Sequence, residues 1–149
     1  MKYHFEENQK FTQRWIWIVL FIITLILYKF IEETNHNNFI KYTPIIIPLI
    51  FYFAELRIKV NDKGLYYQFF PFHFKYNTVK AEEIKKVISK KYNPITEYGG
   101  WGIKKGVEGK AYNTSGKLGI VIYLKNGEKI LFGSKKNKEL EKVIKKIIL

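Results

Sequence analysis

Two apolar runs in the first third of the chain decide its architecture. Residues 15–31 read WIWIVLFIITLILYKFI and residues 39–56 read FIKYTPIIIPLIFYFAEL, with the polar connector EETNHNN at residues 32–38. At a rise of about 1.5 Å per residue, the first run forms a helix of about 25 Å, close to the hydrocarbon thickness of a bilayer at about 30 Å. The second run contains Pro44 and Pro48, so we expect a kinked helix there. The pair predicts a transmembrane hairpin with two spans.

Three other interpretations of these runs stay open. The pair also suits a re-entrant or interfacial hairpin, or a buried helical pair in a soluble protein. A cleaved signal peptide would likewise place basic residues such as Lys10 and Arg14 ahead of an apolar run. The residues from Phe30 to Thr34 lack the small-residue pattern of a cleavage site. We therefore expect an uncleaved anchor.

Cations flank the outer ends of the hairpin, whereas the connector has only Glu32 and Glu33 as charged residues. The cations are Lys2, Lys10, Arg14, Arg57, Lys59 and Lys63. By the positive-inside rule, both termini and the domain that follows lie in the cytoplasm, at a bacterial inner membrane. Residues 1–56 carry five cations and five anions, so the whole excess of +13 lies on residues 57–149. This basic domain would meet the anionic inner leaflet.

The sequence from Arg57 onward predicts a mainly-β domain. Short stretches rich in Ile, Val, Tyr and Phe alternate with turn residues, as in an antiparallel sheet. The clearest hairpin joins residues 119–125 to 128–132 through Asn126 and Gly127, a pair that favours a type I′ turn. Apolar residues then recur at helical spacing from Leu140 to Ile148, with Asn137 as a candidate N-cap. We expect about seven antiparallel strands in a β-barrel or sandwich, capped by a C-terminal helix.

This arrangement is that of a pleckstrin-homology-like domain, and four stretches carry a more specific resemblance. They are Tyr92–Ile95, Glu97–Ile103, Ala111–Gly116 and Ile130–Ser134. With them, the chain resembles bacterial membrane proteins of unknown function in which a transmembrane hairpin precedes a pleckstrin-homology-like domain. The resemblance covers nearly the whole chain and implies three parts: a cytoplasmic tail at 1–14, the hairpin at 15–56 and the domain at 57–149. It brings no activity with it.

Residues that commonly perform catalysis are sparse. Cysteine is absent, which excludes disulfides, thiol nucleophiles and thiolate metal sites. His4, His36 and His73 fall in separate predicted elements, so we expect no metal site or catalytic base from them. Glu97, beside a glycine cluster, is the carboxylate of most interest, but no acid partner is evident. We expect no enzyme activity, no cofactor and no small-molecule substrate.

Two candidate interaction sites remain. The first is the loop Tyr98, Gly99, Gly100, Trp101 and Gly102. Its glycines either let a ligand approach Trp101 closely or bend a strand, and a third interpretation places Trp101 in the lipid headgroup layer. The second is a basic surface of six lysines, namely Lys85, Lys86, Lys90, Lys91, Lys104 and Lys105.

We therefore expect a non-enzymatic binding or scaffold module at the cytoplasmic face of the membrane, with a protein partner or anionic lipid as its ligand. A membrane-tethered nucleic-acid-binding protein is the less favoured alternative, because residues such as Tyr66 and Lys75 interleave aromatic rings with cations. A structural subunit of a membrane complex is a third. The lysine excess is weak evidence for any of them, since lysines also serve as solvated surface.

Overall fold

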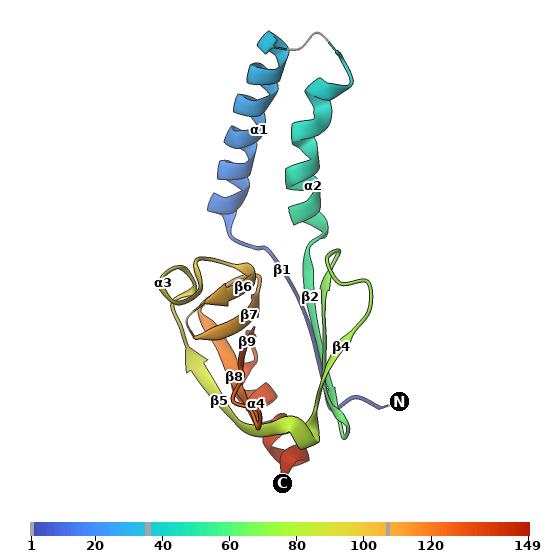
Figure 1. The fold of residues 1–149 in the computed structure, drawn as a ribbon, viewed down its shortest axis with the longest axis vertical. Coiled ribbons are helices and arrows are strands. Elements are labelled where there is room, and N and C mark those ends of the chain that lie inside the picture. The colour runs from blue at the N-terminus through green and yellow to red at the C-terminus, as the bar shows by residue number, and fades with distance from the viewer. Residues whose placement is uncertain (1, 35–36, 107) are drawn as a thin grey trace.

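The computed structural model describes residues 2–34, 37–106 and 108–149. A pair of helices stands on a domain of two β-sheets, and the C-terminal helix lies at the end opposite that pair (Figure 1). Asn35 and His36 of the predicted connector lie outside the described residues.

The helical pair consists of one long helix and a shorter return leg. Helix α1 (Arg14–Thr34) has 21 residues with a mean hydropathy of 2.1 in its most apolar window, and it is the one described helix long and apolar enough to cross a membrane. The return leg is a 3₁₀ helix, η1 (Ile40–Ile45), followed by the eight-residue helix α2 (Ile46–Phe53).

The predicted second span over residues 39–56 is therefore wrong. Pro44 lies inside η1, where it lacks the N–H that a continuous α-helix needs. Pro48 is tolerated because it falls in the first turn of α2, whose N–H groups have no partner within the helix. The helix ends at Phe53, and Ala54 already has an extended backbone that leads into a strand.

Sheet A contains a strand from the segment that was predicted to be an N-terminal tail. Its four strands, in spatial order, are β1 (Phe5–Lys10), β2 (Glu55–Asn61), β3 (Gly64–Phe70) and β4 (Asn77–Lys80). β1 pairs antiparallel with β2, from Phe5 opposite Val60 to Lys10 opposite Glu55. Residues on both sides of the helical pair thus belong to one sheet, and the predicted division at residue 57 cuts through β2.

Sheet B has five strands, and the turn η2 (Ala81–Glu83) connects it to sheet A. In spatial order they are β5 (Ile84–Lys91), β8 (Leu118–Leu124), β9 (Lys129–Gly133), β7 (Gly109–Asn113) and β6 (Gly102–Gly106). β7 and β9 run parallel, whereas the other pairs in this sheet are antiparallel.

The predicted pleckstrin-homology-like barrel of about seven antiparallel strands is contradicted by this topology. Both sheets are open, because β4 ends at η2 and β5 then pairs with β8 instead of continuing sheet A. The extra strand β1 and the parallel pair β7–β9 are further departures from the expected arrangement.

The predicted C-terminal helix and the β8–β9 hairpin are confirmed, although two details differ. The turn is not type I′, because that turn needs a positive φ at both central residues and only Gly127 has one, at 90°. Instead the Asn126 side chain accepts from the Glu128 N–H at 2.9 Å. Helix α4 (Asn137–Ile148) begins at Asn137 itself, so Lys136 occupies the cap position.

The main core lies between the two sheets and is closed by α4. Alternate residues of β8 point to opposite faces of sheet B, so Ile120 and Ile122 join this core while Val121 joins a second cluster. The short helix α3 (Pro94–Tyr98) contributes buried Tyr98 to the second cluster. Sheet B is therefore covered on both faces.

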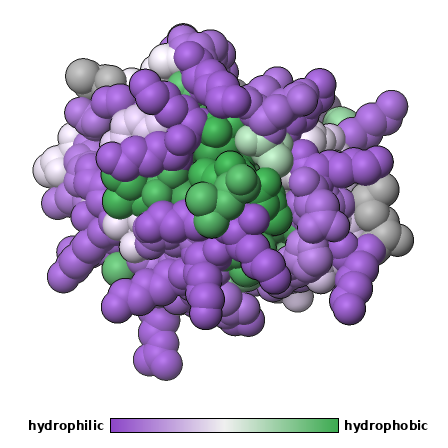
Figure 2. Space-filling view, turned by 90° about the horizontal axis from the view of Figure 1, so that it is seen from below, coloured by the Kyte–Doolittle hydropathy of each residue, from purple (hydrophilic) through white to green (hydrophobic). Residues whose placement is uncertain are grey.

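The end of the domain opposite the helical pair is rich in lysine. Figure 2 shows this end, with an apolar patch surrounded by hydrophilic residues. Helix α4 supplies half-buried Val143, Ile147 and Ile148 together with the exposed cations Lys142 and Lys146. Positive charge is thus spread over the domain, and it is not confined to the side from which the helices emerge.

Phe132 is expected to be a major source of domain stability. Its side chain is fully buried, and its ring centroid lies 5.5 Å from that of Tyr112 and 4.9 Å from that of Tyr67. Phe132→Ala should lower the free energy of unfolding by about 3–5 kcal/mol through the cavity it leaves. Urea unfolding of the full chain in mild detergent, followed by circular dichroism, measures this. The control Phe74→Ala removes a ring that is 85% exposed and should cost less than about 0.5 kcal/mol. An equal loss of unfolding free energy in the two variants would contradict the assignment of Phe132 to the core.

Candidate functional site at the hairpin base

The base of the helical pair is a junction of three parts of the fold. β1 runs through Phe11 into α1, and α2 runs through Ala54 into β2. Because Lys10 lies opposite Glu55, both legs leave sheet A at the same end. The loop between α3 and β6, which contains Trp101, lies against this base.

All three tryptophans of the chain gather at this junction. The Trp101 ring centroid is 5.8 Å from that of Trp15, the second residue of α1. Trp17 Nε1 donates to the carbonyl oxygen of Phe11 at 3.4 Å. Trp101 Nε1 donates to the carbonyl oxygen of Gly116 at 3.0 Å. Tryptophan side chains favour the boundary between water and lipid. The base of the helical pair is therefore the part of the molecule best suited to that boundary.

Glycines give Trp101 its position. Gly99 ends α3 with a φ of 73°, and Gly100 and Gly102 have φ values of 119° and 118°. Side-chain-bearing residues rarely adopt these values, so the loop turns sharply on either side of Trp101. The strand-bending interpretation accounts for these glycines, and the same bends bring half-buried Trp101 against the core.

The short helix that precedes the loop is capped at its N-terminal end by Asn93 and is tied to β5 through Glu97. Asn93 Oδ1 accepts from the N–H groups of Ile95 and Thr96, and Glu97 Oε1 accepts from the Asn93 N–H at 2.8 Å. Glu97 also forms a close ion pair with Lys90 of β5. The pKa of Glu97 lies below its ordinary value, first because the Lys90 side chain donates to it and then because the Asn93 backbone does. Glu97 thus positions the loop and has no catalytic partner among its contacts.

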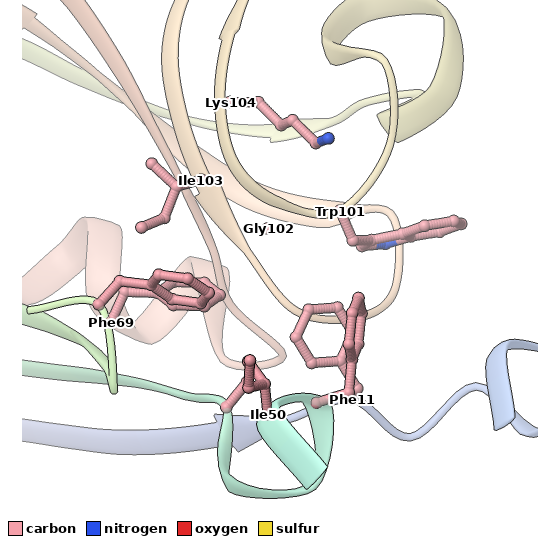
Figure 3. A pocket seen from close by; sticks show the side chains of 10 residues that line it. Phe11, Ile50, Phe69, Trp101, Gly102, Ile103 and Lys104 are labelled. Carbon is pink, nitrogen blue, oxygen red and sulfur yellow. The ribbon is translucent and has the colours of Figure 1, made fainter. Parts of the chain in front are cut away.

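Two depressions flank Trp101, and together we name them the junction pocket. One has a volume of about 210 Å³ and lies between α2 and the sheets, while the other, of about 340 Å³, lies between α1 and the glycine loop. They share Phe11, Phe51, Trp101 and Lys104. Figure 3 shows the smaller one, with Phe69 and Ile103 on one side of the space and Phe11 and Trp101 on the other.

Lys104 is the charged side chain among the described residues that line the junction pocket. It is half-buried, and its Cε lies 4.0 Å from where a Cβ would stand on Gly100 or Gly102. The aliphatic stem therefore lies along the glycine loop. The part of the chain that the structure describes places no carboxylate within ion-pair distance of its ammonium group.

The six lysines predicted to form one basic surface fall into two groups. Lys85, Lys86, Lys90 and Lys91 lie on β5, whereas Lys104 and Lys105 lie on β6. These strands are the two outer strands of sheet B, so the groups lie at opposite edges. Lys90 is neutralised by Glu97, and the Lys86 ammonium lies 5.9 Å from the Tyr123 ring centre. Only Lys104 lies at the junction pocket.

Metal or cofactor binding finds no support in side-chain clustering. Within residues 2–34, 37–106 and 108–149, no three His, Asp or Glu side chains come together as a metal site would require. Phe11 and Phe51, which line both depressions, are among the pocket residues that sequence reasoning missed. Both are ordinary apolar residues in the sequence, and only the pairing of β1 with β2 brings them to Trp101.

No family model matches the chain, and no curated protein or solved structure is significantly similar to it. The family resemblance seen in the sequence therefore stays a prediction, and functional inference rests on the geometry of the junction.

Removing the Glu97 carboxylate should destabilise the protein in a pH-dependent way. Because the folded pKa is lowered, the contribution of Glu97 is present above its ordinary pKa of 4.5 and is lost as the pH falls through the lowered value. At pH 7, Glu97→Gln should lower the midpoint of thermal unfolding by about 2–4 °C, corresponding to about 1 kcal/mol. This difference should shrink towards zero at acidic pH.

The control Glu82→Gln removes an ion pair with Lys80 in which both side chains are largely exposed, so little change is expected at any pH. A difference for Glu97→Gln that is equally large at pH 7 and at pH 3 would contradict the assigned role.

Proposed function

We propose that this protein is a membrane-anchored binding module that meets anionic lipid through its basic domain and catalyses no reaction. The observation that carries the proposal is the bare apolar surface of the helical pair. Only 11% of the most apolar window of α1 is buried within the protein, and Phe21, Ile26 and Phe30 are each more than 60% exposed. A continuous apolar surface of this kind is strongly unfavourable in water and suits a bilayer.

The length of α1 and the topology at its base support the proposed anchor. Its 21 residues rise about 31 Å, near the hydrocarbon thickness of a membrane. Since β1 precedes α1 and pairs with β2 after α2, both ends of the helical pair are held at the same end of sheet A. Cleavage after α1 would remove β1 from sheet A, which favours a retained anchor over a signal peptide.

The distribution of charge supports a cytoplasmic domain. Lys10 and Arg14 lie directly before α1, and Arg57 and Lys59 lie on the strand that follows α2. Cations beside a membrane helix favour the cytoplasmic side, where the leaflet is also anionic. The net charge of +13 then draws the domain to that surface.

A binding role, rather than a catalytic one, is supported by the junction pocket. Its walls are apolar and aromatic, and the described lining offers Lys104 as its charged group. General acid and base catalysis needs titratable groups within hydrogen-bond reach of a substrate. Apolar walls with one cation instead suit recognition of an anionic amphiphile.

Charges placed on α1 should detach the protein from membranes. The wild-type chain is expected to stay in the membrane pellet after alkaline carbonate extraction. Phe21→Lys combined with Ile26→Lys should move most of it into the supernatant, because each buried lysine costs about 2.5–3.5 kcal/mol at the centre of a bilayer. Phe74→Lys, which alters an exposed ring outside the helices, should leave the protein in the pellet. Release of the wild-type chain by carbonate would refute the anchor.

Cysteine labelling should locate the domain relative to the membrane. The chain has no cysteine, so Phe74→Cys introduces one exposed thiol into the loop before β4. A membrane-impermeant maleimide should label this thiol after cell lysis and leave it unlabelled in intact cells. Labelling in intact cells would place the domain on the outer side.

A further inference from the structure

The walls of the junction pocket match a hydrocarbon chain better than a polar molecule. The Phe11 and Phe51 ring centroids are 5.1 Å apart, and Phe11 is only 7% exposed, so the pocket floor is fixed by packing. Trp101 Nε1 already donates to Gly116, which leaves its ring as an apolar wall. The volumes of about 210 and 340 Å³ lie near the lower limit of about 300 Å³ for sites that hold drug-sized ligands. Such spaces suit part of one acyl chain.

The position of the pocket brings acyl chains within reach. It lies where α1 and α2 leave the sheets, and it is flanked by Trp15 and Trp101, whose rings favour the layer between headgroups and chains. Under the proposed membrane anchor, this opening faces the outermost part of the hydrocarbon layer. A lipid chain can enter without its headgroup leaving the interface.

Lys104 supplies a positive charge that can pair with an anionic headgroup. Its stem lies along the glycine loop and it lines both depressions, and its ammonium group has no carboxylate partner among the described residues. A cation in this position favours a lipid with net negative charge over a zwitterionic lipid. The neighbouring Lys105 is exposed and does not line either depression.

We propose that the junction pocket is a binding site for one acyl chain of an anionic phospholipid of the surrounding bilayer, whose phosphate pairs with Lys104. This inference rests on the proposed membrane anchor and names the ligand that the module recognises. It also assigns Trp101 a second role, as the wall against which the chain lies.

Trp101 fluorescence provides the test. Trp15→Phe with Trp17→Phe leaves Trp101 as the sole tryptophan of the full chain, which is then reconstituted into phosphatidylcholine vesicles. One sample contains a small fraction of phosphatidylglycerol with brominated acyl chains, and the other contains the same fraction of brominated phosphatidylcholine. Bromine quenches tryptophan on contact. We expect quenching by the anionic lipid to saturate at about fivefold lower lipid fraction than quenching by the neutral one.

Two lysine variants separate the pocket from general surface charge. Lys104→Gln should abolish the preference for phosphatidylglycerol, whereas Lys105→Gln, on the same strand, should retain it. Equal quenching by the two lipids in the Lys104-containing chain, or a preference that survives Lys104→Gln, would overturn the proposal. Flotation of the same vesicles distinguishes the two hypotheses: protein that fails to float refutes the anchor, whereas protein that floats without selective quenching refutes only the lipid site.

A second measurement uses the unsubstituted chain and so does not depend on folding of the tryptophan variants. Phosphatidylglycerol with a photoreactive group in its acyl chain should crosslink to peptides that contain Phe11, Phe51 or Trp101. An excess of unlabelled phosphatidylglycerol should reduce this crosslinking several-fold more than an equal excess of phosphatidylcholine. Crosslinks confined to the exposed surface of α1 would contradict occupation of the pocket.

Discussion

The pairing of β1 with β2 is the contact on which the other features depend. It places Lys10 opposite Glu55, so both legs of the hairpin leave one sheet side by side. β1 also reaches sheet B, because Gln9 Nε2 donates to the carbonyl oxygen of Gly133 at 2.7 Å and the Ser134 hydroxyl donates to Glu7. A six-residue strand therefore connects the helices, sheet A and sheet B. Backbone pairing in the sheet gives the hairpin a defined position on the domain.

The junction pocket follows from this connection. Phe11 continues β1, Phe51 lies in the last turn of α2, and Trp101 comes from the loop before β6, so each wall belongs to a different part of the fold. The glycines around Trp101 and the ion pair between Lys90 and Glu97 hold the third wall in place. The pocket at the base of the helical pair combines an apolar lining with a cation, Lys104. An anionic lipid has the matching pair of features, an apolar acyl chain and a negatively charged headgroup.

Local sequence patterns predicted the elements better than their connections. The apolar run of α1, the β8–β9 hairpin and the amphipathic helix α4 all have strong periodicity, and each was located correctly. Strand β1 reads FEENQK, which has almost no strand-forming character, so only its tertiary pairing with β2 makes it a strand. The parallel contact of β7 with β9 likewise depends on distant segments. Trp101 was predicted to be a site residue because glycines surround it, whereas Phe11 and Phe51 carried no comparable signal.

The chain order around β1 also imposes a sequence of events on biosynthesis. β1 emerges from the ribosome first, but its partner β2 is made only after α1 and α2. The nascent chain therefore presents its apolar hairpin before any sheet can form, and closing this long loop must precede the remaining assembly. Under the proposed membrane anchor, insertion into lipid and completion of sheet A become coupled steps. If the chain did not return along α2, β1 would stay unpaired and sheet A would lack its outermost strand.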